Sequence, residues 1–106
     1  MIPEKRVEQA LKYLHDTDEE VARARAWMIS LEKQEKTILA TEFLKHEGTV
    51  GEKEAQSRAS ELFRSWRTKY VQAVLDYETL KTKRTHEELV IEVWRTESAN
   101  ARKGNL

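Results

Sequence analysis

The sequence predicts an all-α protein built as a long antiparallel helical hairpin with coiled-coil-like packing, and three observations support this. The 106 residues include one proline and three glycines, so few positions interrupt a helix. Charged residues make up 36% of the chain, above the roughly 25% of an ordinary domain, as is typical of long solvated helices. Apolar residues recur at alternating spacings of three and four, which indicates a coiled-coil-like seam.

Capping patterns divide this helical chain into elements. Thr17 and Glu20 have the spacing of a capping box, in which each side chain satisfies an unpaired N–H at a helix start. Thr49 and Glu52 repeat that spacing directly after Gly48, so a helix end is followed at once by a helix start. Such a short connection makes the flanking helices antiparallel neighbours. We predict a single helical domain over residues 1–106, with helices at about 3–15, 17–47 and 50–102.

The third predicted helix carries the longest apolar seam. The seam is aromatic in its first half, polar at two positions and then apolar again; its positions are Phe63, Trp66, Tyr70, Ala73, Tyr77, Leu80, Arg84, Glu87, Ile91 and Trp94. At 1.5 Å per residue this helix spans on the order of 75–80 Å, whereas the second spans about 45 Å. Thr85 and Glu88 offer a further capping spacing, which leaves open whether the helix kinks there.

The unequal helix lengths predict self-association. The second helix does not cover the third, and a single hairpin has too few facing helices to enclose the aromatic side chains. A two-fold homodimer that forms a bundle is the simplest solution. The residues expected at this contact are Trp27, Phe63, Trp66, Tyr70, Tyr77, Ile91 and Trp94. The alternative is a monomeric three-helix bundle in which the first helix folds back.

Charge and composition restrict the expected partners and location. The chain has 19 basic and 19 acidic residues, so no overall attraction to nucleic acid or to an anionic membrane is implied. Residues 16–54 hold ten acids and six bases, a net charge of −4, and residues 55–86 hold seven bases and three acids, a net charge of +4. This complementarity favours packing of the two arms on each other. Without cysteine, a secretory leader or a long apolar run, we expect a cytoplasmic protein with no membrane contact.

No residue pattern predicts catalysis, a metal site or cofactor binding. Glu42 and His46 share a helix face, but a metal site needs three or four ligands, so an ion pair is the favoured interpretation. Glu88 and Glu92 place carboxylates on adjacent turns, as a Mg²⁺-dependent pyrophosphatase would require, but a facing helix would have to supply more. We therefore expect a non-enzymatic interaction protein without a small-molecule substrate.

Nucleic-acid binding is the alternative function. Basic residues interleave with aromatic residues in the third helix, and single-stranded nucleic acid is commonly held by such a combination. The residues that would contact a partner or nucleic acid are Arg58, Arg64, Arg67, Arg84, Arg95, Asn100 and Arg102. Because the aromatic residues fall on the seam, where a core needs them, self-association remains the leading hypothesis.

The C-terminal segment carries the most distinctive local sequence. Residues 94–102 read WRTESANAR, a Trp-Arg pair followed by small residues and an Asn-x-Arg ending. Together with the turn at residues 48–54 and the third helix, this segment resembles small helical proteins encoded by phages and prophages, some of which lie among recombination and replication genes. The resemblance covers about residues 40–102. It implies a phage accessory protein and transfers no catalytic residue.

Overall fold

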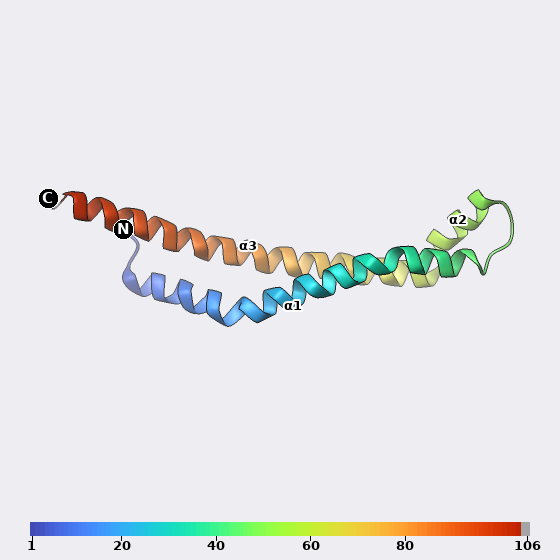
Figure 1. The fold of residues 1–106 in the computed structure, drawn as a ribbon, viewed down its shortest axis with the longest axis horizontal. Coiled ribbons are helices and arrows are strands. Elements are labelled where there is room, and N and C mark those ends of the chain that lie inside the picture. The colour runs from blue at the N-terminus through green and yellow to red at the C-terminus, as the bar shows by residue number, and fades with distance from the viewer. Residues whose placement is uncertain (105–106) are drawn as a thin grey trace. The chain divides into compact units, whose positions relative to one another are not determined.

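The computed structural model describes residues 1–104, which form three helices and no strand. The helices are α1 (Glu4–Phe43), α2 (Val50–Ala59) and α3 (Glu61–Gly104), shown from blue to red in Figure 1. The chain divides into two compact units: unit 1 joins Met1–Ala22 to the chain from Glu78 onward, and unit 2 is Arg23–Tyr77. In each unit, a part of α1 lies antiparallel to a part of α3. The predicted all-α fold and helical hairpin are therefore confirmed.

The first helix is longer than the sequence predicted. α1 runs through 40 residues, so the predicted break between residues 15 and 17 is wrong. The Thr17 hydroxyl does not cap a helix start but donates to the carbonyl oxygen of Tyr13 at 2.8 Å, a bond that a helix interior accommodates. Nη1 of Arg84 on α3 donates to the Thr17 hydroxyl at 2.6 Å and to the Leu14 carbonyl at 2.7 Å. These tertiary contacts stabilise the helix where the local pattern favoured an end.

The turn after α1 follows the predicted chemistry, although α1 ends at Phe43 rather than near residue 47. Gly48 has a φ of 122°, a conformation that costs little without a Cβ atom. The Thr49 hydroxyl accepts the backbone N–H of Glu52 at 3.2 Å and so caps the start of α2. The predicted helix start at this threonine is confirmed.

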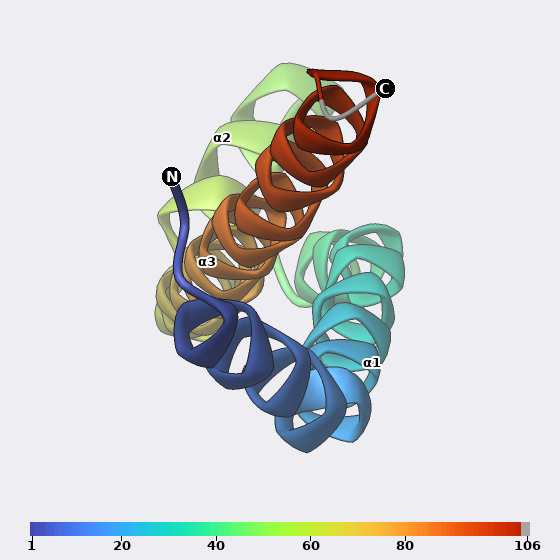
Figure 2. The same ribbon diagram turned by 90° about the vertical axis from the view of Figure 1, so that its left-hand side faces the viewer.

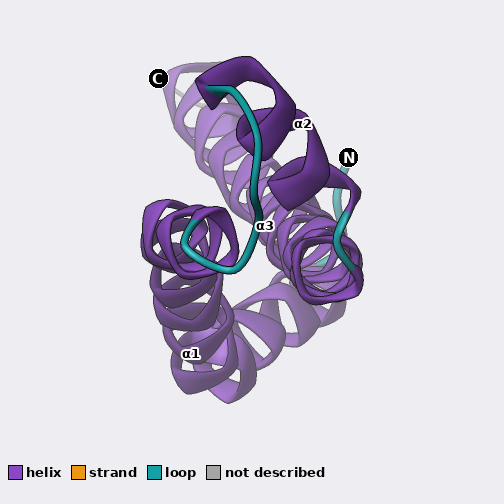
Figure 3. Cartoon of the chain, turned by 90° about the vertical axis from the view of Figure 1, so that its right-hand side faces the viewer, coloured by secondary structure: helices purple, strands orange, loops and turns teal. Residues whose placement is uncertain are grey.

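Ser60 interrupts the predicted 50–102 helix. Figure 3 shows α2 and α3 as two separate helices. Its backbone is extended, with φ −66° and ψ 152°. Its hydroxyl donates to the Ser57 carbonyl at 2.7 Å and accepts the N–H of Phe63 at 3.2 Å, so the side chain closes one helix and caps the next. The prediction of one unbroken helix is wrong at this residue. By contrast, α3 continues as a helix through Arg84 and Thr85.

The core of unit 2 is the aromatic half of the predicted seam. Its buried residues are Leu31, Phe63, Trp66 and Ala73, with Met28, Ile38, Leu39 and Tyr70 packed against them. The Trp66 ring stacks on the Tyr70 ring with 5.4 Å between the centroids and 6° between the planes. The indole N–H of Trp66 donates to the Leu31 carbonyl at 2.7 Å. This hydrogen bond satisfies the polar atom of the largest core side chain.

Unit 1 has a small apolar core and depends more on polar contacts. Val7 and Ala10 are its buried apolar residues among those described. Figure 2 shows the blue start of α1 and the red end of α3, the two segments that make up this unit. The aromatic positions of the predicted seam, up to Tyr77, thus lie in unit 2, whereas its polar positions Arg84 and Glu87 lie in unit 1.

Candidate interaction surfaces

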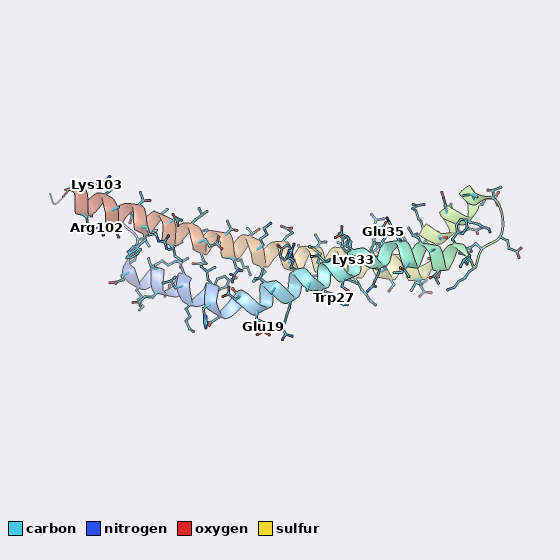
Figure 4. The ribbon with its side chains drawn as sticks, viewed as in Figure 1. Glu19, Trp27, Lys33, Glu35, Arg102 and Lys103 are labelled. Carbon is cyan, nitrogen blue, oxygen red and sulfur yellow. The ribbon has the colours of Figure 1, made fainter. Side chains whose placement is uncertain are left out.

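The aromatic residues expected at a partner contact occupy different environments. Phe63 and Trp66 are 9% and 6% exposed, so the fold already uses them within the chain. Trp27 is 54% exposed on α1, where Figure 4 labels it. The remaining members of the set are half-buried: Tyr70, Tyr77, Ile91 and Trp94. The seam as a whole is therefore a mainly intramolecular surface, with Trp27 outside it.

Arg84, one of the predicted nucleic-acid contacts, is the centre of a polar cluster in unit 1. Its Nη1 donates to the Leu14 carbonyl and the Thr17 hydroxyl, and its Nη2 lies 2.7 Å from Oδ1 of Asp18. The Arg84 side chain is 15% exposed, and Thr17 is buried. A guanidinium engaged by three acceptors positions α3 against α1 rather than presenting its charge to solvent.

A second polar contact in unit 1 joins Arg6 to Glu87. Their side chains form two bonds of 2.7 and 2.9 Å, and Glu87 is 18% exposed. The hydrogen bonds from Arg6 lower the pKa of the Glu87 carboxyl below its ordinary value, against the opposing effect of partial burial. The same hydrogen bonds raise the pKa of Arg6. Further along the unit, the Ile2 N–H donates to the Glu97 carboxylate at 2.8 Å.

The lowered pKa of Glu87 predicts a specific loss of stability in acid. A carboxyl whose pKa is lower in the folded than in the unfolded state stabilises the fold above its unfolded pKa, and this contribution disappears as the pH falls through the folded pKa. The free energy of unfolding, measured by urea denaturation between about pH 3 and pH 7, should therefore depend less on pH in Glu87→Gln than in the wild type. The exposed neighbour Glu88 supplies the control, since Glu88→Gln should retain the wild-type dependence. Identical pH profiles for Glu87→Gln and the wild type would contradict the assignment.

The face of α3 that points away from the unit 2 core carries exposed apolar side chains. Val71 and Leu75 are each 57% exposed, and helical periodicity places them opposite Trp66 and Ala73. An open groove of about 430 Å³ runs beside them, lined by Arg64, Arg67, Thr68, Val71 and Gln72. We call Thr68, Val71 and Leu75 the unit 2 outer patch. Arg64 and Arg67, which the sequence analysis named as possible partner contacts, are exposed here. Sequence reasoning missed the apolar residues Val71 and Leu75 that follow them on α3.

A corresponding patch lies on α3 within unit 1. Leu89 is 57% exposed and Val93 is 47% exposed, on the face of the helix opposite Arg84 and Ile91. With Thr96, these two residues form what we call the unit 1 outer patch. An open groove of about 340 Å³ next to Leu89 is lined by Glu78, Lys81, Thr82, Thr85 and His86. The signal that sequence reasoning missed is a second set of three- and four-residue spacings on the same helix.

The other predicted contact residues do not converge on one site. Arg95 and Arg102 line an open groove of about 560 Å³ with Trp94, Ser98 and Ala99, and Arg95 pairs with Glu92 at 3.1 Å. Asn100 is exposed but is not part of that groove. Arg58 lines a separate cavity of about 330 Å³ between α1 and α2, with Leu39, Ala40, Phe43, Glu54 and Ser57. The predicted basic residues are thus distributed over four places, one of them the Arg84 cluster.

Within residues 1–104, no three histidine, cysteine or carboxylate side chains gather in a way that could hold a metal ion. The buried Glu42 contacts Lys45 at 3.0 Å and lies 3.6 Å from Nε2 of His46, so the pair considered from sequence lies within an ionic cluster on α1 and the following turn. None of the helices described is both long and apolar enough to cross a membrane.

Comparisons of the chain with protein families, curated proteins and solved structures found no match.

Proposed function

We propose that the chain is a non-enzymatic helical protein that functions by self-association, with the outer face of α3 as its contact surface. The observation that carries this proposal is the exposure of Val71 and Leu75, each 57%, on a helix whose opposite face already forms a core. A soluble helix normally confines its apolar residues to one face, and a second apolar face is typical of a helix with a second partner.

A second copy is the partner that best fits this surface. The chain has equal numbers of acidic and basic residues, so two copies do not repel each other through net charge. Isologous dimers are the commonest closed assembly and need only one self-complementary surface. The resemblance of residues 94–102 to small phage and prophage proteins supports the further proposal that this dimer is a phage or prophage accessory protein.

Nucleic-acid binding is the second candidate function, and the exposed Arg64 and Arg67 beside the unit 2 outer patch favour it. Guanidinium groups flanking apolar side chains would contact phosphates through charge-assisted hydrogen bonds. The two functions would use the same face of α3, so single-stranded DNA would compete with the second copy. The neutral chain and the scattered basic residues make self-association the better supported of the two.

The substitution Leu75→Glu tests the proposed function. Burying a carboxylate at the contact would weaken the dimer by ~10-fold or more in Kd, because the charge loses its hydration without gaining a partner. Light scattering across a concentration series would show the mass of the variant falling towards that of the monomer. Leu62→Glu is the matched control, since Leu62 is 45% exposed on a different face of α3. The mass of this variant should equal that of the wild type at every concentration.

Two results would contradict the proposal. One is a wild-type chain that stays monomeric, and the other is equal weakening of the dimer by both variants. Dissociation of the dimer by single-stranded DNA at low salt would instead support nucleic-acid binding at the same face of α3, because phosphate binding is strongest at low ionic strength.

A further inference from the structure

We propose that the second copy binds in an antiparallel orientation, with the unit 2 outer patch of one chain against the unit 1 outer patch of the other. This inference rests on the self-association proposed above and adds the orientation and register of the contact. It makes the dimer two-fold symmetric, with two equivalent contacts, each formed by one patch from each copy.

The order and spacing of residues in the two patches carry the inference. Along α3, the unit 2 outer patch reads Thr68, Val71, Leu75, with spacings of three and four. The unit 1 outer patch reads Leu89, Val93, Thr96, with spacings of four and three, which is the same set of residue types in reverse order. An antiparallel pair of α3 helices therefore aligns leucine with leucine, valine with valine and threonine with threonine. Apolar side chains then meet apolar side chains in both contacts.

The two threonines are suited to burial in such a contact. The hydroxyl of Thr68 donates to the Arg64 carbonyl at 3.1 Å, and the hydroxyl of Thr96 donates to the Glu92 carbonyl at 3.1 Å. Each hydroxyl is thus satisfied by the preceding turn of its own helix. A hydroxyl that already has an acceptor is buried at a lower cost than an unpaired one, and its methyl group contributes apolar area. The ends of both patches therefore tolerate removal from water.

Charges distinguish the antiparallel from the parallel orientation. Thr82 lies midway between Thr68 and Thr96 in the sequence, so antiparallel alignment centres on it and places Glu78 level with His86 of the second copy. Both of these exposed side chains line the groove around Thr82. Parallel alignment would instead place Glu78 level with Glu78 of the second copy, and like charges that face each other are destabilising. Antiparallel alignment avoids this repulsion between the two Glu78 carboxylates, which favours that orientation.

Cysteine cross-linking tests the orientation directly, because the chain contains no cysteine of its own. Leu75→Cys and Leu89→Cys would be prepared separately, mixed, allowed to exchange subunits and oxidised. In the antiparallel dimer these two positions face each other, so the mixed disulfide between one Leu75→Cys chain and one Leu89→Cys chain should be the main product. Two Leu75→Cys chains alone should cross-link poorly, since their cysteines would lie about 21 Å apart along the helix axis.

Measuring the mass of each sample before oxidation shows whether the chains were dimeric, and this distinguishes a failure of the orientation from a failure of self-association. Efficient disulfides within Leu75→Cys alone and within Leu89→Cys alone would indicate a parallel dimer and overturn the inference. Dimers that form no mixed disulfide would overturn it as well, while leaving the proposed self-association intact. Monomers, in the variants and in the wild type, would refute self-association and the inference together.

Discussion

Replacing Trp66 with alanine is expected to lower the free energy of unfolding by about 3–5 kcal/mol, the usual cost of truncating a large buried aromatic side chain. The ring is 6% exposed, stacks on Tyr70 and lies 5.3 Å from the Phe63 ring, measured between centroids. Its indole N–H also donates to the Leu31 carbonyl, so the substitution removes a buried hydrogen bond between α1 and α3 together with the packing. Urea denaturation followed by circular dichroism measures the loss.

Trp27 provides the matched control for this prediction. It is 54% exposed on α1, so Trp27→Ala should change the free energy of unfolding by no more than about 0.5 kcal/mol. Both variants should be measured at protein concentrations where the wild type is monomeric, because contacts between subunits would otherwise add to the free energy of unfolding. Similar effects of the two substitutions would mean that Trp66 does not form the core of unit 2.

Replacing Arg84 with methionine should have the second largest effect and should act on unit 1. Methionine retains most of the apolar stem but removes the donors to the Leu14 carbonyl and the buried Thr17 hydroxyl. Hydrogen bonds that involve a charged group contribute about 1.5–3 kcal/mol, so the free energy of unfolding should fall by roughly that amount. The contact with Asp18 adds little, because that carboxylate is 67% exposed and screened by water.

Amide hydrogen exchange localises the effect of Arg84→Met. Amides of α1 in unit 1, around residues 10–20, should exchange faster, whereas those of α1 in unit 2 should keep their wild-type rates. Lys83→Met is the control, since Lys83 is the exposed neighbour of Arg84 on the same helix. If exchange in Arg84→Met matched that in Lys83→Met, the polar cluster would not stabilise unit 1.

Helical periodicity made the core-facing positions predictable from the sequence. Phe63, Trp66 and Ala73 are buried, and Arg84 and Glu87 face α1, as the seam predicted. These assignments depend on the geometry of a single helix, which fixes the residues that share a face whatever the partner is. The Thr49 cap was predictable for the same reason, because its hydrogen bond is local.

The helix boundaries were less predictable because local signals compete with tertiary contacts. Thr17 carries a capping pattern, yet its hydroxyl is held by Arg84, 67 residues away in the sequence. Ser60 lies in a segment with good helix formers on both sides, and its capping role depends on hydrogen bonds with Ser57 and Phe63. At that break the sequence has Ser60, a residue type that often caps a helix start, followed by the acidic Glu61 in the first turn of α3. This pair was the signal from which the start of α3 could have been predicted.

The candidate contact surface shows where sequence reasoning is weakest. Large aromatic residues suggested the partner surface, but α1 covers Phe63 and Trp66. Val71 and Leu75 were overlooked because they lie off the main seam, on a face of α3 that was expected to be solvated. Whether a side chain is buried depends on which face of its helix the neighbouring helix covers. That is a property of the fold rather than of the residue type.

Sedimentation equilibrium of the unmodified chain over a range of micromolar concentrations tests the central claim most directly. Self-association through the outer face of α3 predicts a mass that rises with concentration from the monomer value of 12.5 kDa to twice that value. A mass that remains at 12.5 kDa at every concentration would contradict the claim, because the exposed valine and leucine residues of α3 would then not contact a second copy.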